Sequence, residues 1–593
     1  AAADGVERAV REALAERDPA ATLVVARPGD RFTRLGDGEF ALDPAEPSDI
    51  AALVTALHEG GLPERILLHR GAVAADPGEP DAAEREFFLL FHLTRELLHC
   101  KPEHPVRLLH AHAPAGGGVS PAHAAAGAFA RVVRQEKPSF RYRAVTLVRS
   151  GEGPDALRAE ADALLAEFGH DDDAAEVRLD GSGRAVRRLQ PLPRPGAGQP
   201  RVTAREGGTY LITGGLGGLG LIFARALAAQ AHVNLVLSGR SEPDERQAAA
   251  LAELEASGSR VRFVRADVST AEGVETVVRQ ARDLFGPLTG VIHSAGVLRD
   301  SFLLKKTPEE AQAVLAAKVA GTRLLDTALR AARLDFFVLF SSLAGALGNL
   351  GQADYAFANS YLDHYAAWRE EERRQGRRHG STVAVAWPLW EEGAMRGGDG
   401  EALGLSPLAT GEGVAALPAA LAAGTPHVVV VKGTARTWEI LAAGPGHEAP
   451  AAAGEEAPAA PRAEAPRQAA EAAPAAPAPS GPSSGGGADP VLRRRTRGYL
   501  IDLVARFTKL PAAEIRTNVS FGRYGVESIM IIAMTQEMEG HLGPLAKTLF
   551  FEYDSIDELT DHLVRVKERE LRARFGLAEP SAAPAAPSAA PAA

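Results

Sequence analysis

Short apolar runs alternate with amphipathic stretches in the N-terminal part of the chain. Between residues 21 and 148 the apolar runs read TLVVA, RILLHRG, VRLLHAHA and YRAVTLV, and longer patterns such as AAEREFFLLFHLTRELLHC lie between them. Short apolar runs are typical of buried strands, whereas apolar residues spaced by three or four positions are typical of helices. The alternation therefore predicts a parallel sheet covered by helices.

The same alternation begins again at Gly208. The run TYLIT leads through GGLGGLG into the helical pattern LIFARALAAQ, and the runs VNLVLSGR, VRFVRADV, GVIHSAG and FFVLFSS follow with helical patterns between them. This order predicts a second parallel sheet with helices on both faces. The expected fold class is thus α/β, with two doubly wound Rossmann-type sheets.

Two segments lack the apolar residues that a core needs. Residues 446–488 and the C-terminal tail consist largely of Ala, Pro, Gly and Ser, which is typical of extended tethers. The block between them contains the amphipathic stretches RTRGYLIDLVARFTKL and SIMIIAMTQEMEGHL, which predict a small helical bundle. The predicted divisions are 1–200, 201–445, 446–488, 489–572 and 573–593.

Composition excludes several classes of protein. The 593 residues are 46% hydrophobic and 24% charged, and no apolar stretch is long enough to span a bilayer. A net charge of −11 argues against a general affinity for nucleic acid. The single cysteine, Cys100, excludes an internal disulfide and a thiolate-rich zinc site, so we expect a reducing, cytoplasmic location.

The chain ends and the histidines carry two further expectations. The chain begins AAADGVERAV, without an initiator methionine or a secretory signal pattern, and we interpret it as an excised piece of a longer protein. Histidines 92, 99, 104, 110 and 112 follow no compact ligand pattern, so we expect no metal site.

A glycine-rich loop between a predicted strand and a predicted helix indicates a dinucleotide site. Glycines there let the backbone approach a pyrophosphate, and the helix N-terminus adds partial positive charge. The expected cofactor-binding residues of this loop are Thr213, Gly214, Gly215, Leu216, Gly217, Gly218, Leu219 and Gly220.

The ends of the following strands refine the choice of cofactor. Arg240, flanked by Gly239 and Ser241, occupies the strand end where NAD-specific sites place an acid. An arginine suits a 2′-phosphate, so we expect NADPH rather than NADH, with a merely solvated arginine as the alternative. The remaining expected cofactor contacts are Asp267, Val268, Ser294, Ala295 and Gly296.

The segment VLFSSLAGALGNLGQADYAFANSYLD, from Val338 to Asp363, resembles the ketoreductases of modular polyketide synthases, a branch of the short-chain dehydrogenases. Ser342, Tyr355 and Asn359 fit the active-site spacing of that family, and Lys318 fits its lysine. Ordinary short-chain dehydrogenases carry a lysine where Asn359 stands, and the exchange is typical of the polyketide branch. The resemblance covers nearly all of residues 1–440 and implies that 1–200 is a catalytically silent structural subdomain and 201–445 the catalytic one.

The chemistry of ketone reduction explains these residue types. The ketone needs a hydride and a proton, and a phenol exchanges protons poorly at neutral pH unless a nearby cation lowers its pKa. We expect Lys318 to supply that cation to Tyr355 and Ser342 to hold the ketone oxygen. Asn359 is expected to orient Lys318 and a water.

The stereochemical outcome is predicted from the same resemblance. Asp300 stands where the B-type members carry the second aspartate of their Leu-Asp-Asp motif, although Arg299 replaces the first. Leu347 stands where A-type members carry tryptophan. The resemblance therefore implies B-type reduction, which gives the D-configured hydroxyl.

The small C-terminal block resembles acyl carrier domains. Gly525, Val526, Glu527 and Ser528 resemble the motif Gly-x-Asp-Ser, with Glu527 in place of aspartate. The resemblance implies that Ser528 bears a 4′-phosphopantetheine arm, whereas a helix N-cap is the alternative role for this serine.

Taken together, these features predict NADPH-dependent reduction of a carrier-bound β-ketoacyl thioester to a β-hydroxyacyl thioester. The resemblance implies as partners a phosphopantetheinyl transferase, ketosynthase and acyltransferase domains, an optional dehydratase, and a homodimeric parent synthase. Two alternatives stay open: a noncatalytic carrier scaffold with a silent reductase, and a free-standing dehydrogenase that acts on small alcohols.

Overall fold

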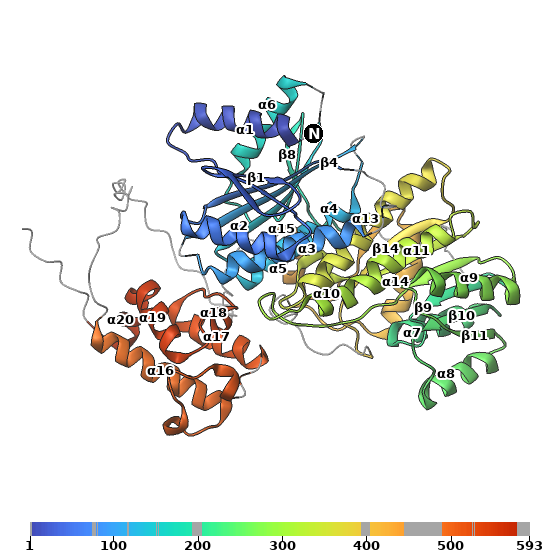
Figure 1. Cartoon of the computed structure of the whole chain (residues 1–593). Helices are drawn as coiled ribbons and strands as arrows, with labels where there is room; N and C mark the ends of the chain where they lie inside the picture. Colours follow the sequence, from blue (N-terminus) through green and yellow to red (C-terminus); the bar gives the residue numbers. More distant parts are fainter. Residues whose placement is uncertain are drawn as a thin grey trace, which may run out of the picture. The chain divides into compact units, whose positions relative to one another are not determined.

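The computed structural model of the chain describes residues 3–577 except 74–78, 80, 103, 116–117, 150, 152, 193–203, 393–403, 444–488, 525 and 527. By its internal contacts the chain divides into two compact units (Figure 1). The first consists of Ala1–Gly446 with Ala546–Glu552, and the second of His447–Leu545 with Tyr553–Ala593. The first unit contains an N-terminal lobe, residues 3–192, and a central lobe, residues 204–443.

The central lobe contains a seven-stranded sheet in the order β11-β10-β9-β12-β13-β14-β15, and every neighbouring pair is parallel. The first strand in sequence, β9, thus lies inside the sheet, and the strand order reverses beside it. The expected doubly wound α/β fold is confirmed. The strands are β9 (Thr209–Thr213), β10 (Asn234–Gly239), β11 (Arg260–Arg265), β12 (Gly290–His293), β13 (Phe336–Ser342), β14 (Ser381–Trp387) and β15 (His427–Val429).

Side chains of the inner strands are buried on both faces of this sheet, which explains their nearly continuous apolar sequence. In β9, Leu211 packs into one core cluster, whereas Tyr210 and Ile212 pack into a second cluster on the opposite face. Helices cover both faces. The helical elements of the central lobe are α7 (Gly218–Ala228), α8 (Glu245–Ala256), α9 (Ala271–Phe285), α10 (Pro308–Leu315), the π-helical turn η2 (Ala316–Ala320), α11 (Gly321–Ala328), α12 (Leu343–Leu347), α13 (Ala353–Arg374), α14 (Thr410–Ala422) and α15 (Ala435–Ala443).

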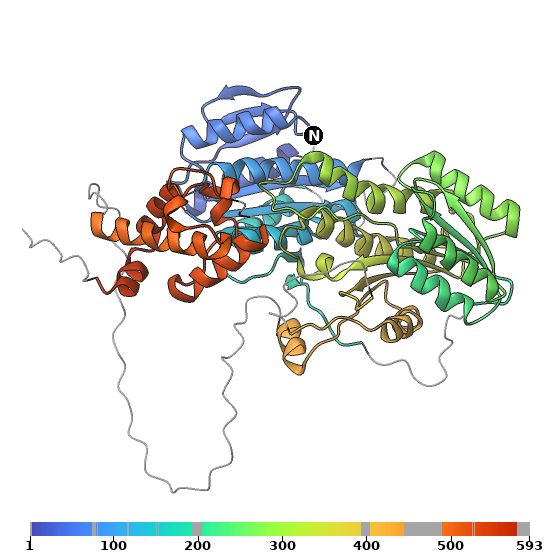
Figure 2. The same ribbon diagram turned by 90° about the horizontal axis from the view of Figure 1, so that it is seen from below.

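The N-terminal lobe contains a five-stranded sheet in the order β4-β5-β6-β7-β8, in which the β7–β8 pair is antiparallel and the other pairs are parallel. A small three-stranded sheet, β1-β3-β2, packs beside α2 (Figure 2). The strands are β1 (Val25–Pro28), β2 (Thr33–Gly36), β3 (Glu39–Leu42), β4 (Arg65–Val73), β5 (Val106–Pro114), β6 (Phe140–Leu147), β7 (Glu176–Asp180) and β8 (Gly183–Val186). The helices are α1 (Ala3–Arg17), α2 (Pro47–Glu59), α3 (Ala82–His99), α4 (Pro121–Ala124), α5 (Ala126–Glu136) and α6 (Pro154–Glu167).

Helix α13 joins the two lobes. It contacts β13 and β14 of its own sheet and also α3, α4 and α5 of the N-terminal lobe. Its sequence, ADYAFANSYLDHYAAW, carries small or apolar residues all round, which is typical of a helix that is buried on every side. Phe357 of α13 packs edge to face against Phe87 of α3, with 5.3 Å between the ring centroids. The N-terminal lobe therefore supports the helix that carries Tyr355.

The described residues of the second unit form a small helical bundle, as expected. Helix α16 contacts α17, α19 and α20, and buried apolar side chains such as Leu500, Met534 and Leu559 fill the space among them. The helical elements of the second unit are α16 (Pro490–Thr508), the 3₁₀ turns η4 (Ala512–Glu514) and η5 (Phe521–Tyr524), α17 (Ser528–Leu542), α19 (Ile556–Val566) and α20 (Glu568–Phe575). The short helix α18 (Leu549–Glu552) is assigned to the first unit.

All of the predicted linker, 446–488, and most of the predicted tail, 573–593, lie outside the described residues. In the part of the chain that the structure describes, no helix is both long and apolar enough to cross a membrane.

Candidate active site

The glycine-rich loop follows β9 and leads directly into α7. Gly214 has φ +64°, and a Cβ on it would lie 2.9 Å from the Cα of Ala295. A Cβ on Gly220 would lie 2.4 Å from the carbonyl oxygen of Gly214. Only glycine fits these two positions, because any side chain would strike backbone. Gly217 and Gly218 at the N-terminus of α7 are exposed, so the backbone there is open to a ligand.

The neighbouring strand ends lie along the same carboxyl edge of the sheet. The Ser294 hydroxyl donates a hydrogen bond to the carbonyl oxygen of Thr213 at 2.6 Å, which ties the end of β12 to the end of β9. The Asp267 carboxylate accepts hydrogen bonds from the backbone N–H and the hydroxyl of Ser269. The predicted cofactor residues at this edge beyond the loop are Gly239, Arg240, Ser241, Asp267, Val268, Ser294, Ala295 and Gly296.

Two arginines stand side by side at this edge. Arg240 is exposed just after β10, and Arg265, the last residue of β11, is aligned with Gly239. The Arg265 Nε donates to the carbonyl oxygen of Arg240 at 3.3 Å, and its guanidinium lies 3.5 Å from Glu242. Arg265 is not among the residues predicted from the sequence, although its position at the end of a predicted strand, two residues before Asp267, was a usable signal.

Lys318 lies in the π-helical turn η2, a rare element that often occurs at functional sites. Its side chain is buried, and its Nζ donates a hydrogen bond to the carbonyl oxygen of Phe340 in β13 at 2.8 Å. The Nζ also lies 5.5 Å from the centroid of the Tyr355 ring. A Cβ on Gly296 would come within 3.0 Å of the lysine Cε, so Gly296 leaves room for this side chain.

The structure brings Ser342, Tyr355 and Asn359 together with Lys318. Ser342 ends β13 and caps α12, and its Oγ accepts a hydrogen bond from the N–H of Ala344. Tyr355 and Asn359 lie one turn apart in α13, and the Asn359 Nδ2 donates to the carbonyl oxygen of Tyr355 at 2.7 Å. The Asn359 Oδ1 is buried and has no hydrogen-bond partner within the described residues.

The pKa of Tyr355 differs from the expectation drawn from the sequence, and that of Lys318 is also shifted. Burial lowers the pKa of Lys318 to about 8, and the charge of Asp363 raises it. Burial raises the pKa of Tyr355, and hydrogen bonds from the side chains of Ser342 and Asn359 lower it by less. The expected net lowering of the phenol pKa is therefore wrong for this arrangement, because the cost of burying a phenolate is the larger effect.

Of the two residues from which the stereochemistry was predicted, Asp300 lies in a loop and Leu347 lies in helix α12. Asp300 is exposed and its Oδ2 accepts a hydrogen bond from the Gln352 Nε2 at 2.9 Å. Leu347 ends α12, and its carbonyl oxygen accepts a hydrogen bond from Gln135 of the N-terminal lobe. The Asp300–Gln352 contact was not predicted, because no sequence signal pairs residues this far apart.

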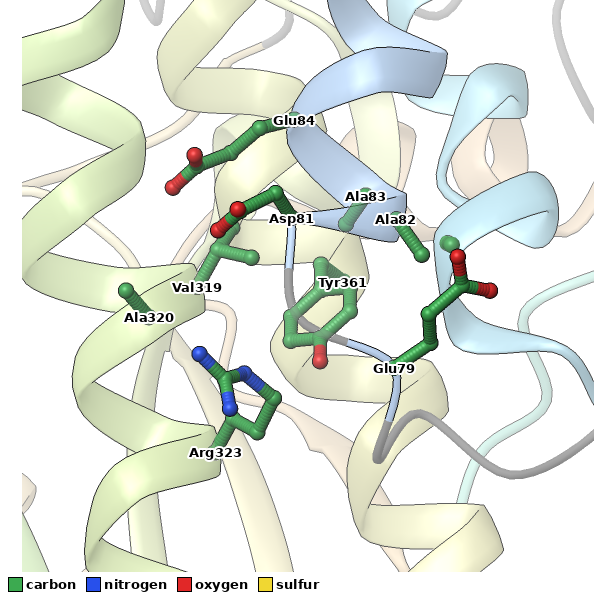
Figure 3. Close-up of a pocket in the computed structure, with 10 residues that line it drawn as sticks. Glu79, Asp81, Ala82, Ala83, Glu84, Val319, Ala320, Arg323 and Tyr361 are labelled. Carbon is green, nitrogen blue, oxygen red and sulfur yellow. The ribbon is translucent and has the colours of Figure 1, made fainter.

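A surface hollow elsewhere in the first unit is distinct from this cluster. It is lined by residues of both lobes, including Val319 and Ala320 of η2, but none of the predicted catalytic residues lines it. Figure 3 shows acidic side chains, Arg323 and Tyr361 around the opening. The hollow therefore marks a place where the two lobes meet and holds no part of the predicted site.

Two histidines of the N-terminal lobe lie against the buried carboxylate of Glu86. The His110 Nε2 lies 2.6 Å from the Glu86 Oε1, and the His123 Nε2 lies 3.4 Å from the Glu86 Oε2. Among the residues that the structure describes, no group of three His, Cys, Asp or Glu side chains is arranged to hold a metal ion.

Ser528 is the first residue of α17, at the position that the sequence analysis expected. Its motif neighbours Gly525 and Glu527 lie outside the described residues.

Three parts of the chain match known protein families. Residues 208–392 match the family described as KR domain, and residues 498–563 match the family described as phosphopantetheine attachment site. Residues 5–160 match the family described as beta-ketoacyl synthase-like, N-terminal. The matches thus fall on the central lobe, the second unit and the N-terminal lobe separately.

Similar curated proteins are large polyketide synthases. Polyketide synthase PksL of Bacillus subtilis is 36% identical over 376 residues, which is 62% of this chain and 8% of PksL. Polyketide synthase ThaG of Burkholderia thailandensis is 30% identical over 559 residues, which covers 71% of this chain and 10% of ThaG. The chain therefore spans a tenth or less of the length of these two proteins.

Similar solved structures are ketoreductases. An N-terminal ketoreductase from the macrolactin assembly line superposes with a TM-score of 0.64 at 29% identity, covering 74% of this chain and 87% of that chain. A ketoreductase domain from the bacillaene assembly line gives a TM-score of 0.54 at 27% identity, covering 63% of this chain and 94% of that chain. A coverage of 74% exceeds the central lobe and the second unit combined, so the similarity includes the N-terminal lobe.

Proposed function

The chain is a ketoreductase domain followed by a phosphopantetheine carrier domain, as in modular polyketide synthases, and we propose that it reduces a carrier-bound β-ketoacyl thioester with NADPH. The product is the β-hydroxyacyl thioester. One observation carries the proposal: the side chains of Ser342, Tyr355, Asn359 and Lys318 meet at the end of β13, beside the glycine-rich loop.

The residues at the edge of the central sheet fit a dinucleotide. The tight backbone at Gly214 and Gly220 has no room for side chains, and the open N-terminus of α7 suits a pyrophosphate. Exposed Arg240 and Arg265 suit the 2′-phosphate of NADPH, since guanidinium groups bind phosphate in a fork geometry. When bound, the nicotinamide supplies the hydride that the carbonyl carbon of the substrate receives.

The side chains near Tyr355 supply the proton and hold the substrate. Ser342 donates a hydrogen bond to the ketone oxygen, and Tyr355 transfers its phenolic proton to that oxygen as negative charge develops there. The raised pKa of Tyr355 serves this direction of reaction, because the phenol stays protonated at neutral pH. An alkoxide is a much stronger base than a phenolate, so the proton transfer to it stays favourable.

After this transfer Tyr355 is a phenolate, which regains its proton from water, and Lys318 and Asn359 support it in that state. The ammonium of Lys318 lies over the tyrosine ring and stabilises the phenolate that remains after the transfer. The unpartnered Oδ1 of Asn359 points to a water or a substrate group as its partner, since a buried amide oxygen seldom stays without one.

We assign B-type reduction, with a D-configured hydroxyl, on the basis of Asp300. Its hydrogen bond to Gln352 fixes the carboxylate next to the segment that leads into α13, where it can guide one face of the ketone toward the nicotinamide.

The carrier domain delivers the substrate on the arm that Ser528 bears. A thioester on a tethered arm reaches the reductase at an effective concentration of roughly millimolar when the linker is long enough. In the parent synthase we propose a homodimeric cytoplasmic assembly in which ketosynthase and acyltransferase domains supply the β-ketoacyl chain, with a dehydratase as an optional next step. A phosphopantetheinyl transferase loads the arm.

The decisive experiment measures NADPH oxidation with a β-ketoacyl thioester mimic. We expect turnover by the wild-type chain, a D-configured product on chiral chromatography, and a rate lowered by about 10²- to 10⁴-fold in Tyr355→Phe. Tyr355→Phe should still bind NADPH, which a fluorescence titration checks. No oxidation by the wild-type chain would instead favour the noncatalytic carrier scaffold, and an L-configured product would contradict the B-type assignment.

A further inference from the structure

A buried carboxylate of the N-terminal lobe lies beneath two loops of the central lobe. Glu136, the last residue of α5, is 1% exposed. Its Oε2 accepts a hydrogen bond from the backbone N–H of Leu303 at 2.9 Å, and its Oε1 accepts one from the N–H of Gly351 at 3.2 Å. One side chain thus binds the backbones of two loops that are far apart in sequence.

Both loops lead to residues of the proposed active site. Leu303 lies three residues after Asp300, and Gly351 directly precedes Gln352 and the start of α13. The loops also bind each other, because the N–H of Ser301 donates to the carbonyl oxygen of Gly351 at 2.9 Å. The loops that carry Asp300 and Gln352 are therefore both held in place by hydrogen bonds to Glu136. We call these two loops and Glu136 the frame.

A buried ion pair extends this frame. The Lys306 Nζ lies 2.9 Å from the Asp354 Oδ2, and both side chains are fully buried. The same ammonium donates to the carbonyl oxygen of Arg299. The loop from Arg299 to Lys306 is thus held at one end by Lys306 and in the middle by Glu136.

The cost of burying these groups argues against an incidental contact. A buried carboxylate is tolerated when hydrogen bonds satisfy its oxygens, and here the two backbone N–H groups do so. Irregular loops lack the regular backbone hydrogen bonds of helices and sheets. A side chain such as Glu136 that accepts a hydrogen bond from each of two loops therefore has a large effect on where the loop backbones lie.

We propose that Glu136 is a positioning residue for the reductase: by binding Leu303 and Gly351 it fixes Asp300 and Gln352 relative to Tyr355, and so selects the face of the ketone that is reduced. The inference rests on the proposed function. It gives the N-terminal lobe, which carries none of the proposed catalytic residues, a specific role in the stereochemical outcome.

The test compares Glu136→Gln with the wild-type full-length chain. Glutamine offers one acceptor oxygen and one N–H₂ group, so it cannot accept from both loop N–H groups as the carboxylate does. Burial raises the pKa of Glu136 to about 7, so assays at pH 8 keep the wild-type carboxylate mostly ionised. With a β-ketoacyl thioester mimic we expect the ratio of D to L alcohol to fall about tenfold and KM to rise more than kcat falls.

A matched control separates positioning from general stability. Glu167 in α6 is another fully buried carboxylate of the same lobe, but Arg143 and Arg184 bind it at 2.6 and 2.7 Å. Glu167→Gln should lower the melting temperature and leave the product ratio unchanged. NADPH affinity should be unchanged in both variants, and hydrogen exchange in peptides covering 298–306 and 348–352 should be faster in Glu136→Gln alone.

Glu136→Asp provides the same test if the glutamine variant does not accumulate, because the shorter side chain keeps the charge but cannot reach both N–H groups. A wild-type product ratio in the Glu136 variants, or an equal loss of selectivity in Glu167→Gln, would overturn the inference. A wild-type chain that fails to oxidise NADPH would instead contradict the proposed function, so the two failures are distinguishable.

Discussion

At the scale of single residues, the charge of Lys318 depends on two opposed influences. Burial disfavours the ammonium and lowers its pKa to about 8, whereas the Asp363 carboxylate favours it. Asp363 is 2% exposed, and its Oδ1 lies 3.4 Å from the Nε2 of His427. A motif match identifies Lys318, but the carboxylate that keeps it charged emerges from the fold.

The pH dependence of reduction follows from this balance. Because the pKa of Lys318 is lowered to about 8, the ammonium is present below that pH and is lost as the pH rises through it. We expect reduction to decline above about pH 8, and Asp363→Asn to move this decline to lower pH by about one unit. Rates across pH 6 to 10 check this. Asp335 has a more exposed carboxylate, so Asp335→Asn serves as the control. An unshifted pH profile in Asp363→Asn would refute the proposed effect of Asp363 on the charge of Lys318.

The preference between the two nicotinamide cofactors belongs to the same scale. Under the proposed function, Arg240 and Arg265 each make a charge-assisted contact to the 2′-phosphate, and a contact of this kind is typically worth ~1.5–3 kcal/mol. We expect Arg240→Ala and Arg265→Ala each to raise KM for NADPH by about tenfold or more and to leave KM for NADH nearly unchanged. The control is Arg262→Ala, because Arg262 is an exposed arginine in β11, the strand of Arg265, but does not lie at its end. Equal losses with both cofactors would show that these arginines do not read the phosphate.

At the scale of elements, α13 owes its position to two lobes. Its apolar and small residues predict burial, but the sequence does not show that α3, α4 and α5 cover the side that faces away from the central sheet. The turn that carries Lys318 is a second example: AAKVA looks like ordinary helix, whereas the structure has a π-helical turn there. The extra residue per turn rotates the following side chains, which pattern counting cannot foresee.

Loss of the Phe87–Phe357 contact tests the role of α13 as the joint. Phe357 is fully buried, so Phe357→Ala should lower the free energy of unfolding of the first unit by about 3–5 kcal/mol. Arg374→Ala, on an exposed side chain of the same helix, should change it by less than about 0.5 kcal/mol. Denaturant unfolding followed by tryptophan fluorescence measures both. A small effect of Phe357→Ala would mean that the N-terminal lobe does not stabilise α13.

At the scale of the whole molecule, the chain couples a reductase to a carrier through a tether that has no core-forming residues. Ser528→Ala should abolish attachment of phosphopantetheine, which intact-protein mass spectrometry after coexpression with a phosphopantetheinyl transferase detects. Reduction of a carrier-bound substrate should then be lost, while a free thioester mimic is still reduced. Attachment that persists in Ser528→Ala would place the arm on another residue.

The sequence alone determined the fold class of both lobes, the helical nature of the second unit and the choice of Tyr355, Lys318, Ser342, Asn359 and Ser528. These features depend on local periodicity and on motifs of short spacing, which the order of residues states directly. The roles of these five residues stay predictions, which the experiments above test. The tertiary structure decided which charged and polar groups lie around these residues.

Glu136, Asp363, Gln352 and the Lys306–Asp354 pair illustrate why. Each contacts a partner that is far away in sequence, and only the packing of the folded chain brings the two together. Burial also reversed one expectation: the pKa of Tyr355 is raised, because desolvation of a phenolate outweighs the favourable contacts. The cost of desolvating the phenolate depends on how completely the surrounding side chains exclude water, which is a property of the folded chain.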